Sequence, residues 1–283
     1  HPLGRVCYHS FIIFVVPHNT NGNHKEDIRL KVTFLGTGTS QGVPVIGCQC
    51  KVCRSADPKD KRLRTSVMIE VNDLVVVIDT GPDFRQQMLQ AGATNLNAIL
   101  YTHEHRDHIA GLDDVRPINF LNRKSMQVYA EDRVLESLKQ TLPYAFEENK
   151  YPGVPDIQLN TIPERAFEVD GIPIIPIRVY HYKLPVLGFR IGDFTYITDA
   201  NYIPEEEKKK IIGTKYLVVN ALRRKKHISH FCLSEAQELA REFSPRMTYF
   251  THMSHQMGLN AEVNTELPEN MMLAYDGLEV EME

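Results

Sequence analysis

One short segment in the middle of the chain, Thr102 to His108, contains three histidines and one aspartate. His103 and His105 are two positions apart, so in extended backbone their side chains point to the same side. Asp107 and His108 are adjacent and can serve a second position if the chain turns there. Imidazole and carboxylate both bind zinc, manganese and iron. A chance match to this spacing has odds of about one in a thousand at this composition. The motif therefore predicts a loop that serves two metal ions, rather than a solvated polar loop.

Further metal-capable side chains follow apolar runs that are predicted to be strands. His181, Asp199 and His252 each stand at the end of such a run. The four side chains of the loop cannot complete two catalytic sites, so more ligands must come from elsewhere in the chain. A capping aspartate or a core histidine is the alternative for each residue alone. Their shared placement favours a common cleft lined by strand ends.

Several other polar residues are candidates for supporting roles. Asp79 ends a predicted strand, and we interpret it as an acceptor that orients a ligand histidine. His227 and His230 precede a predicted helix, and either can donate a proton near neutral pH. His227 is also a candidate contact for a substrate phosphate, next to the basic run 223–226, although such a run is often only a solvated face. Arg116 is a candidate contact for an anionic substrate or a partner in a surface salt bridge.

Three of the five cysteines, Cys48, Cys50 and Cys53, lie close together. An odd cysteine count argues against a disulfide framework and for a reducing, cytoplasmic compartment. Three thiolates on one turn predict a structural zinc site, which needs a fourth ligand. His255 is the candidate. The alternative is three reduced cysteines without a metal.

The predicted elements must bring these residues together. Strands are expected over 31–35, 66–71, 74–78, 98–101, 128–130, 167–169, 172–180, 187–191, 194–198, 217–220, 247–251, 272–274 and 278–280, and helices over 83–91, 109–121, 132–142, 205–212 and 234–243. Both halves hold strands and then helices, which fits two mixed sheets that face each other with helices outside. Residues 29–283 are predicted to form one domain, and residues 1–28 a weakly ordered extension.

The composition narrows the range of partners. The formal net charge is −4, so no general basic field favours nucleic acid. No apolar run approaches the roughly 20 residues that a membrane helix needs. The expected partner is therefore neither nucleic acid nor a membrane.

A family resemblance joins these features. The chain resembles the metallo-β-lactamase superfamily over residues 31–283. Within it, the chain is most similar to the phosphodiesterases of the carbon–phosphorus lyase pathway, which open 5-phosphoribosyl 1,2-cyclic phosphate. The segments that carry this resemblance are Phe34–Ser40, Thr102–Leu112, Tyr180–His181, Ile197–Asp199 and Thr251–His255. The resemblance implies an α/β fold, a four-layer αββα sandwich of two mixed sheets flanked by helices. It also implies a homodimer.

The same resemblance assigns roles to individual residues. It implies one metal on His103, His105 and His181, a second on Asp107, His108 and His252, and Asp199 as the bridge. It favours His230 over His227 as the general acid. It also implies a structural zinc on Cys48, Cys50, Cys53 and His255.

We therefore expect a dinuclear phosphodiesterase that uses two divalent ions, zinc or manganese. A hydroxide that bridges the metals would attack a small anionic phosphodiester, which the resemblance implies to be cyclic, with Asp107 and His230 as the catalytic side chains. Three alternatives stay open: an RNA endonuclease of the ribonuclease Z type, a thioester or lactone hydrolase, and a metal-binding interaction module without catalysis. The negative net charge weakens the first, and the full ligand set weakens the last.

Overall fold

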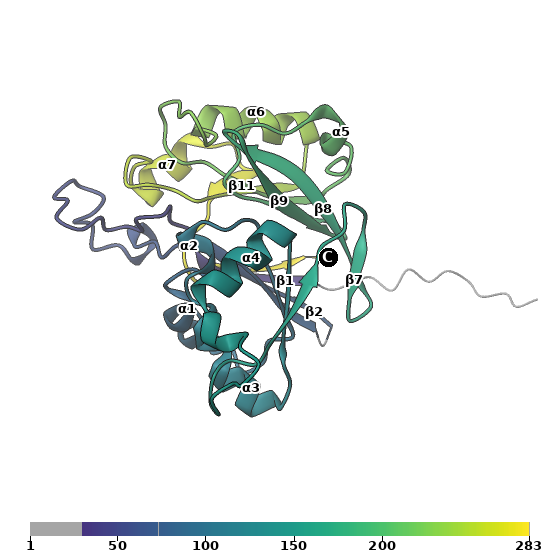
Figure 1. Ribbon diagram of the computed structural model, residues 1–283. Helices are drawn as coiled ribbons and strands as arrows, with labels where there is room; N and C mark the ends of the chain where they lie inside the picture. The colour runs from purple at the N-terminus through teal and green to yellow at the C-terminus, as the bar shows by residue number, and fades with distance from the viewer. Residues whose placement is uncertain (1–29, 73, 283) are drawn as a thin grey trace, which may run out of the picture.

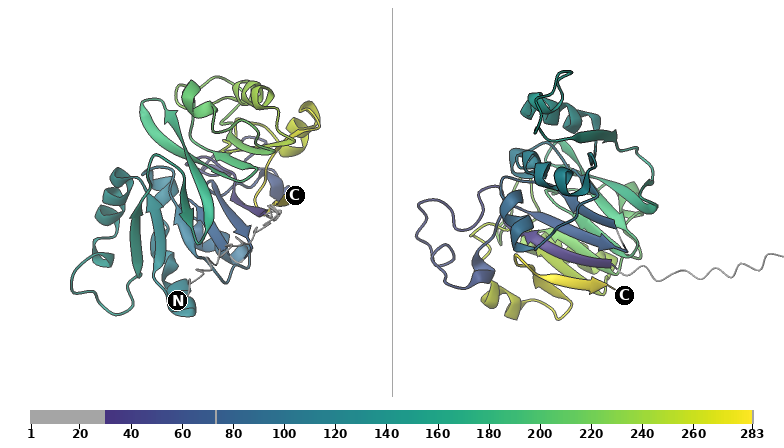
Figure 2. Two further views of the ribbon diagram at one scale, coloured as in Figure 1. Left: turned by 90° about the vertical axis from the view of Figure 1, so that its right-hand side faces the viewer. Right: turned by 90° about the horizontal axis from the view of Figure 1, so that it is seen from below.

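The computed structural model describes residues 30–72 and 74–282, which build two facing β-sheets with helices against their outer faces (Figures 1 and 2). This arrangement confirms the predicted four-layer sandwich of two mixed sheets. The prediction for residues 1–28 lies outside the described residues.

The first sheet has seven strands, and its first four are antiparallel while the rest are parallel. In spatial order the strands are β14 (Glu279–Met282), β1 (Leu30–Gly36), β2 (Ser66–Val71), β3 (Leu74–Ile78), β4 (Ala98–Leu100), β5 (Met126–Ala130) and β6 (Ile157–Thr161). Runs of β-branched residues such as Val75–Ile78 favour strand over helix because they pack well on a pleated surface.

The second sheet also has seven strands and repeats this plan, with four antiparallel strands followed by parallel ones. Its strands are β7 (Phe167–Val169), β8 (Ile172–His181), β9 (Leu184–Ile191), β10 (Phe194–Ile197), β11 (Tyr216–Asn220), β12 (Met247–Thr251) and β13 (Met271–Leu273). Because β8, β10, β11 and β12 run in one direction, their carboxyl ends meet at one edge of the sheet.

Helices cover the outer faces of both sheets (Figure 1). Those of the first half are α1 (Phe84–Gln90), α2 (Arg106–Ile109), α3 (Arg116–Asn122) and α4 (Asp132–Thr141), and those of the second are α5 (Glu205–Lys208), α6 (Leu233–Phe243) and α7 (Asn260–Glu266). Short 3-10 turns occupy Pro58–Asp60, Leu112–Val115 and Pro143–Ala145. The two longest helices are amphipathic: α4 buries Val134, Leu135 and Leu138, and α6 likewise turns one apolar stripe inward.

Three apolar layers hold the sandwich together. Phe34, Phe189 and Tyr196 belong to the layer between the two sheets, and each is fully buried. The other two layers lie between each sheet and its helices. Burying a side chain such as Val, Leu or Phe stabilises the fold by about 1.5–3 kcal/mol. These layers therefore fix the positions of the strand ends.

The structure differs from the predicted helices at three places. The helix expected over 109–121 begins at Arg106 and is interrupted, because Pro117 starts a new helix as its second residue. The helix expected over 205–212 ends at Lys208. The helix α7 was not predicted, since it buries only Asn260 and Val263 and so lacks an apolar stripe.

Within residues 30–72 and 74–282, no helix combines the length and the apolar character that a membrane crossing requires.

Candidate metal centre

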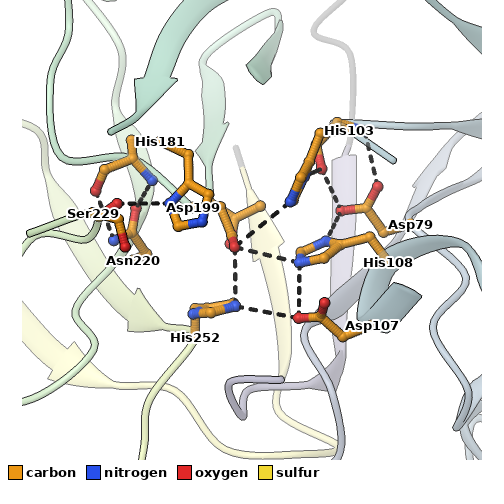
Figure 3. A network of polar contacts seen from close by, with 12 residues as sticks. Asp79, His103, Asp107, His108, His181, Asp199, Asn220, Ser229 and His252 are labelled. Carbon is orange, nitrogen blue, oxygen red and sulfur yellow. Dashed lines mark hydrogen bonds and ion pairs between the residues drawn. The ribbon is translucent and has the colours of Figure 1, made fainter. Parts of the chain in front are cut away.

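Three acidic or imidazole side chains stand just beyond the carboxyl ends of strands. Asp79 follows β3, Asp199 comes two residues after β10, and His252 follows β12. All three have left-handed backbone, with φ values of 63°, 51° and 55°. Such a conformation costs a non-glycine residue about 1–3 kcal/mol, and it persists only where the surrounding structure enforces it, often at functional sites. The packed strands thus hold these residues in strained conformations that bring them into one polar network (Figure 3).

One group of ligand atoms belongs to Asp107, His108, Asp199 and His252, all within 4.8 Å of one another. His108 Nε2 lies 3.3 Å from Asp107 Oδ2 and 3.4 Å from Asp199 Oδ1, and His252 Nε2 lies 3.0 Å from the same Asp199 oxygen. Asp107 and His108 share the group although they are adjacent, because α2 begins at Arg106 and both lie in its single turn. Ligands about 2.0–2.2 Å from one cation lie roughly 3.3–3.6 Å from each other in a tetrahedral site. The group therefore fits one metal ion.

A second group consists of His103, His105 and Asp199. The two imidazole rings lie 4.5 Å apart between centroids, and His103 Nε2 lies 3.7 Å from Asp199 Oδ2. Asp199 thus turns Oδ1 towards His108 and His252 and Oδ2 towards His103. One carboxylate that faces two sets of imidazoles has the geometry of a bridging ligand.

His181 and His230 form a third group with Asp199. The His181 ring lies 5.3 Å from that of His105 and 4.4 Å from that of His230. The Nδ1–H of His181 donates to the carbonyl oxygen of Ser229 at 2.7 Å, which leaves Nε2 free. The structure therefore gathers every predicted metal ligand around Asp199, and it adds His230 to the same cluster.

Hydrogen bonds behind the cluster set which imidazole nitrogen faces it (Figure 3). Asp79 accepts from His108 Nδ1 at 2.7 Å and from the hydroxyl and the backbone N–H of Thr102 at 2.8 Å and 2.9 Å. Because the Thr102 hydroxyl donates to Asp79, it accepts from His103 Nδ1, which lies 2.9 Å away. Both histidines therefore present an unprotonated Nε2 to the cluster when they are neutral.

These nitrogens fit a cation better than they fit their neighbours. In the described part of the chain, Nε2 of His103, His108 and His252 is buried and forms no well-directed hydrogen bond, although each lies 3.0 to 3.7 Å from an oxygen of Asp107 or Asp199. A buried polar atom without a partner costs about 1–3 kcal/mol. Three such atoms that face two carboxylates match the donor set of divalent zinc or manganese.

The electrostatics of the cluster also favour positive charge. Burial alone would raise the pKa of Asp199, but His252 and His108 hold it well below its usual range. Burial lowers the pKa of His252, but the carboxylate of Asp199 outweighs it and raises the pKa to about 9. Because a proton and a metal ion compete for the same nitrogen, the shift marks a place where a cation is favourable. Burial instead lowers the pKa of His103 well below its usual range.

The cysteine cluster forms a separate group with His255. The Sγ atoms of Cys48, Cys50 and Cys53 lie 3.3, 3.4 and 3.5 Å from His255 Nδ1. In a tetrahedral zinc site with Zn–S of about 2.3 Å and Zn–N of about 2.0–2.1 Å, sulfur and nitrogen lie roughly 3.6 Å apart. The four residues are therefore arranged as a closed Cys₃His site requires.

The remaining candidates lie at the margin of the cluster or outside it. His227 is half-buried, and its ring lies 5.3 Å from that of His230. Arg116 forms an ion pair with Asp113, three residues earlier, and is 44% exposed, which fits the surface salt bridge better than a substrate contact.

Two residues with clear positions were not singled out from the sequence. Asn220 is buried at the end of β11, where it accepts from Ala200 N at 2.8 Å and donates to Ala200 O at 3.0 Å, so it holds the turn that carries Asp199. A polar residue at a strand end is the same signal that pointed to Asp199. Ser229 acts through its backbone carbonyl, which leaves no signal in the sequence.

Comparison with known proteins gives three findings. Residues 75–253 match the model of the β-lactamase superfamily domain. The crystal structure of a diphosphatase from the PhnP family superposes with a TM-score of 0.85 at 39% identity, over 90% of this chain and 98% of that one. One curated relative is an octanoyltransferase from Porphyromonas gingivalis, which is 41% identical over 88% of this chain and 51% of that protein. Another is coenzyme PQQ synthesis protein B from Rhodopseudomonas palustris, which is 30% identical over 50% of this chain and 53% of that protein. The chain thus spans about half the length of these curated relatives.

Proposed function

Because this chain belongs to the metallo-β-lactamase superfamily and, within it, to the PhnP family, we propose that it is a metal-dependent phosphodiesterase that hydrolyses a small, cyclic phosphodiester. One observation carries the proposal. Among the described residues, buried imidazole nitrogens that form no well-directed hydrogen bond converge with Asp107 on the two oxygens of Asp199. Two cations held at such a site would concentrate positive charge where the oxygens of an anionic phosphodiester bind.

The ligands divide between two metal positions. His103, His105 and His181 would hold one ion, Asp107, His108 and His252 the other, and Asp199 would bridge them. When bound, two divalent ions would supply a water nucleophile at neutral pH and neutralise charge on the phosphoryl oxygens.

His230 is the proposed proton donor to the leaving oxygen. It is buried beside His181 and His252, and its Nδ1 has no hydrogen-bond partner within residues 30–72 and 74–282. Burial lowers the pKa of His230 to about 3. A bound phosphodiester would oppose this shift, since a nearby negative charge favours the protonated imidazole. His227, beside His230, is the alternative donor or a contact for the phosphate.

Two neighbouring activities are the main competitors. The diphosphatase of the PhnP family supports a phosphoanhydride as the bond that is cleaved, which the same attack at phosphorus would break. The octanoyltransferase name supports an acyl substrate, but this chain covers only half of that protein, so the name need not describe the matched half.

A substrate panel with metal analysis tests the proposal. The purified protein, loaded with zinc or manganese, would be assayed with bis-p-nitrophenyl phosphate, a cyclic nucleotide, a nucleoside diphosphate sugar, an octanoyl thioester, nitrocefin and a short RNA. We expect about two transition-metal ions per chain in addition to one zinc, and turnover of the phosphodiesters. Preferential cleavage of the diphosphate, the thioester or the RNA would replace the proposed substrate, and a metal-loaded protein that cleaves none of them would refute the function.

A further inference from the structure

One arginine outside the metal cluster connects the two halves of the sandwich. Arg133, the second residue of α4, pairs with Glu104 through Nη1 and with Glu131 through Nη2, and Nη2 also donates to the carbonyl oxygen of Pro185. We propose that Arg133 is a positioning residue that holds the histidine loop, residues 103–105, against the β8–β9 hairpin and thereby sets the affinity of one metal position. This inference rests on the proposed function only for the assignment of ligands to the two metal positions.

On the side of the first sheet, Arg133 acts through Glu104. This glutamate lies between His103 and His105, and its side chain points out of the cluster towards α4, because its carboxylate pairs with Arg133. Residues one apart in extended backbone point to opposite sides. Holding Glu104 on one side therefore holds both histidines on the other.

On the side of the second sheet, Arg133 reaches the strand next to the one that carries His181. Pro185 of β9 is paired with Tyr180 of β8, and His181 is paired with Leu184. The carbonyl oxygen that Arg133 binds is therefore one residue along β9 from the partner of His181. A backbone hydrogen bond from Leu187 N to Thr102 O, 3.0 Å long, ties the same two segments together.

The contacts of Arg133 suit a rigid connection between residues 103–105 and the β8–β9 hairpin, which we call the clamp. The side chains of Arg133, Glu104 and Glu131 are 31%, 27% and 18% exposed, so the pairs are shielded from water more than ordinary surface pairs. Glu131 is itself held by Arg178 Nη1 at 2.5 Å. A guanidinium is a planar fork that can bind a carboxylate and a carbonyl at once, which the single ammonium of lysine cannot do in the same geometry.

The clamp acts on one metal position more than on the other. His103, His105 and His181 are the ligands that it joins across the two sheets. The ligands Asp107, His108 and His252 touch neither Glu104 nor Pro185 in the contacts described above. Loss of Arg133 should therefore let His105 and His181 move apart while the second position keeps its geometry.

A stepwise titration with Co²⁺, followed by its visible absorption, tests the proposal on the full chain with the structural zinc in place. His105→Ala and His252→Ala each remove a ligand from one position and so identify the two binding steps. We expect Arg133→Lys and Glu104→Gln to weaken the step that His105→Ala abolishes by about 10- to 100-fold, the range found for residues that orient metal ligands. The step that His252→Ala abolishes should not change.

The matched control is Lys139→Gln, which removes one positive charge from the same helix; among the described residues, Lys139 pairs with exposed Glu136 alone. It should leave both steps unchanged. Thermal unfolding and zinc content show whether each variant is folded. An equal weakening of both steps in a folded Arg133→Lys protein, or no change in either, would overturn the clamp. Two normal Co²⁺ steps in a wild-type protein that cleaves no ester would refute the proposed function and leave the clamp standing.

Discussion

His230 lies where a side chain can serve either as a proton donor or as a metal ligand. It is buried, its ring stacks 4.9 Å from that of His252, and it shares a group of ligand atoms with His181 and Asp199. This placement suits a proton donor beside the reacting phosphate and also suits a further metal ligand. The two roles differ in what the side chain binds.

Replacement of His230 by alanine separates them. We expect turnover of the phosphodiester to fall by about 10² to 10⁴, as for loss of a general acid, while elemental analysis finds the same metal content as in the wild type. His227→Ala, the neighbouring half-buried histidine, is the control and should raise KM more than it lowers kcat if it contacts the phosphate. Loss of a metal ion from His230→Ala would make His230 a ligand instead.

At the scale of single residues, the sequence predicts which residue types form the site far better than how their side chains are oriented. The spacing of His103, His105, Asp107 and His108 was enough to predict that these side chains gather in one cluster with metal-binding chemistry, because few other functions need this density of imidazole and carboxylate. The tautomer of His181 could not be predicted, since it depends on a backbone carbonyl. The contacts of Arg133 also left no signal, because Glu104 and Pro185 are distant from it in the sequence.

Two glycines let α2 approach the strand ends closely. A Cβ atom at Gly81 would lie 2.1 Å from the carbonyl oxygen of Asp107, and one at Gly111 would lie 2.2 Å from that of Gly81. The backbone hydrogen bonds from Thr80 N to His108 O and from Gly111 N to Thr80 O, both 2.8 Å, close the same contact. The position of α2, and with it the second metal position, thus depends on the absence of these side chains.

Gly81→Ala should therefore displace α2 and weaken the Co²⁺ step assigned to Asp107, His108 and His252 by at least about tenfold, with a loss of stability of about 1–3 kcal/mol from overpacking. Gly92→Ala is the control: its φ of 62° imposes strain, but a Cβ there meets nothing within 4 Å. It should cost about 1–2 kcal/mol without changing metal affinity. Equal affinities in the two variants would contradict the dependence on close contact.

Residues 48–62, which include the cysteine cluster, are held at several points to the residues that follow His252. Arg62, which is fully buried, donates to the carbonyl oxygens of Ser254 at 3.1 Å and Gly258 at 3.2 Å, and Asp60 accepts from Asn260 N at 2.7 Å. Four ligand atoms at tetrahedral spacing add a further connection through His255. A zinc ion there would brace the turn that follows β12.

Cys53→Ser should release one zinc per chain and expose residues 44–60 to limited proteolysis, because a structural zinc contributes directly to folding. Cys232→Ser, a buried thiol at the start of α6 and outside the cluster, should keep the zinc and the wild-type cleavage pattern. Unchanged zinc content in Cys53→Ser would show that the four residues are a packed group without a metal.

Most strands were predictable from runs of β-branched residues, and Ser66–Val71, Leu74–Ile78 and Met247–Thr251 have the predicted bounds. Short helices were harder. Helix α2 starts directly after His105 because of tertiary contacts with Thr80 and Gly81, which no local pattern reveals. The pairing of β14 with β1 was likewise not predicted, since it joins residues from opposite ends of the described chain.

Across the whole molecule, the metal cluster takes its ligands from both halves of the sandwich. His103 to His108 follow β4 in the first sheet, whereas in the second sheet His181 ends β8 and Asp199 and His252 follow β10 and β12. Bound metal ions would therefore link the two sheets to each other, and unfolding would have to release them.

Removal of the metals should lower the thermal stability of the whole protein. At a free metal concentration of 100 Kd, one ion adds about 2.7 kcal/mol, and each kcal/mol corresponds to roughly 2–4 °C in Tm for a domain of this size. We expect a chelator to lower Tm by roughly 5–10 °C for each site emptied, measured by calorimetry. His252→Ala should show a smaller shift than the wild type, and an equal shift would mean that the stabilising metal binds elsewhere.

The pairing of β14 with β1 has a consequence for biosynthesis. Val280 lies opposite Val32 and Met282 opposite Leu30, and nearby Asp276 accepts from the Thr37 hydroxyl and Leu63 N. While a ribosome makes the protein, one hydrogen-bonding edge of β1 stays bare until residue 282 has been added. At about 5–20 residues per second this wait is on the order of 10–50 s. A first sheet that formed within that interval would display an open strand edge, the kind of surface that chaperones shield and that neighbouring chains can capture.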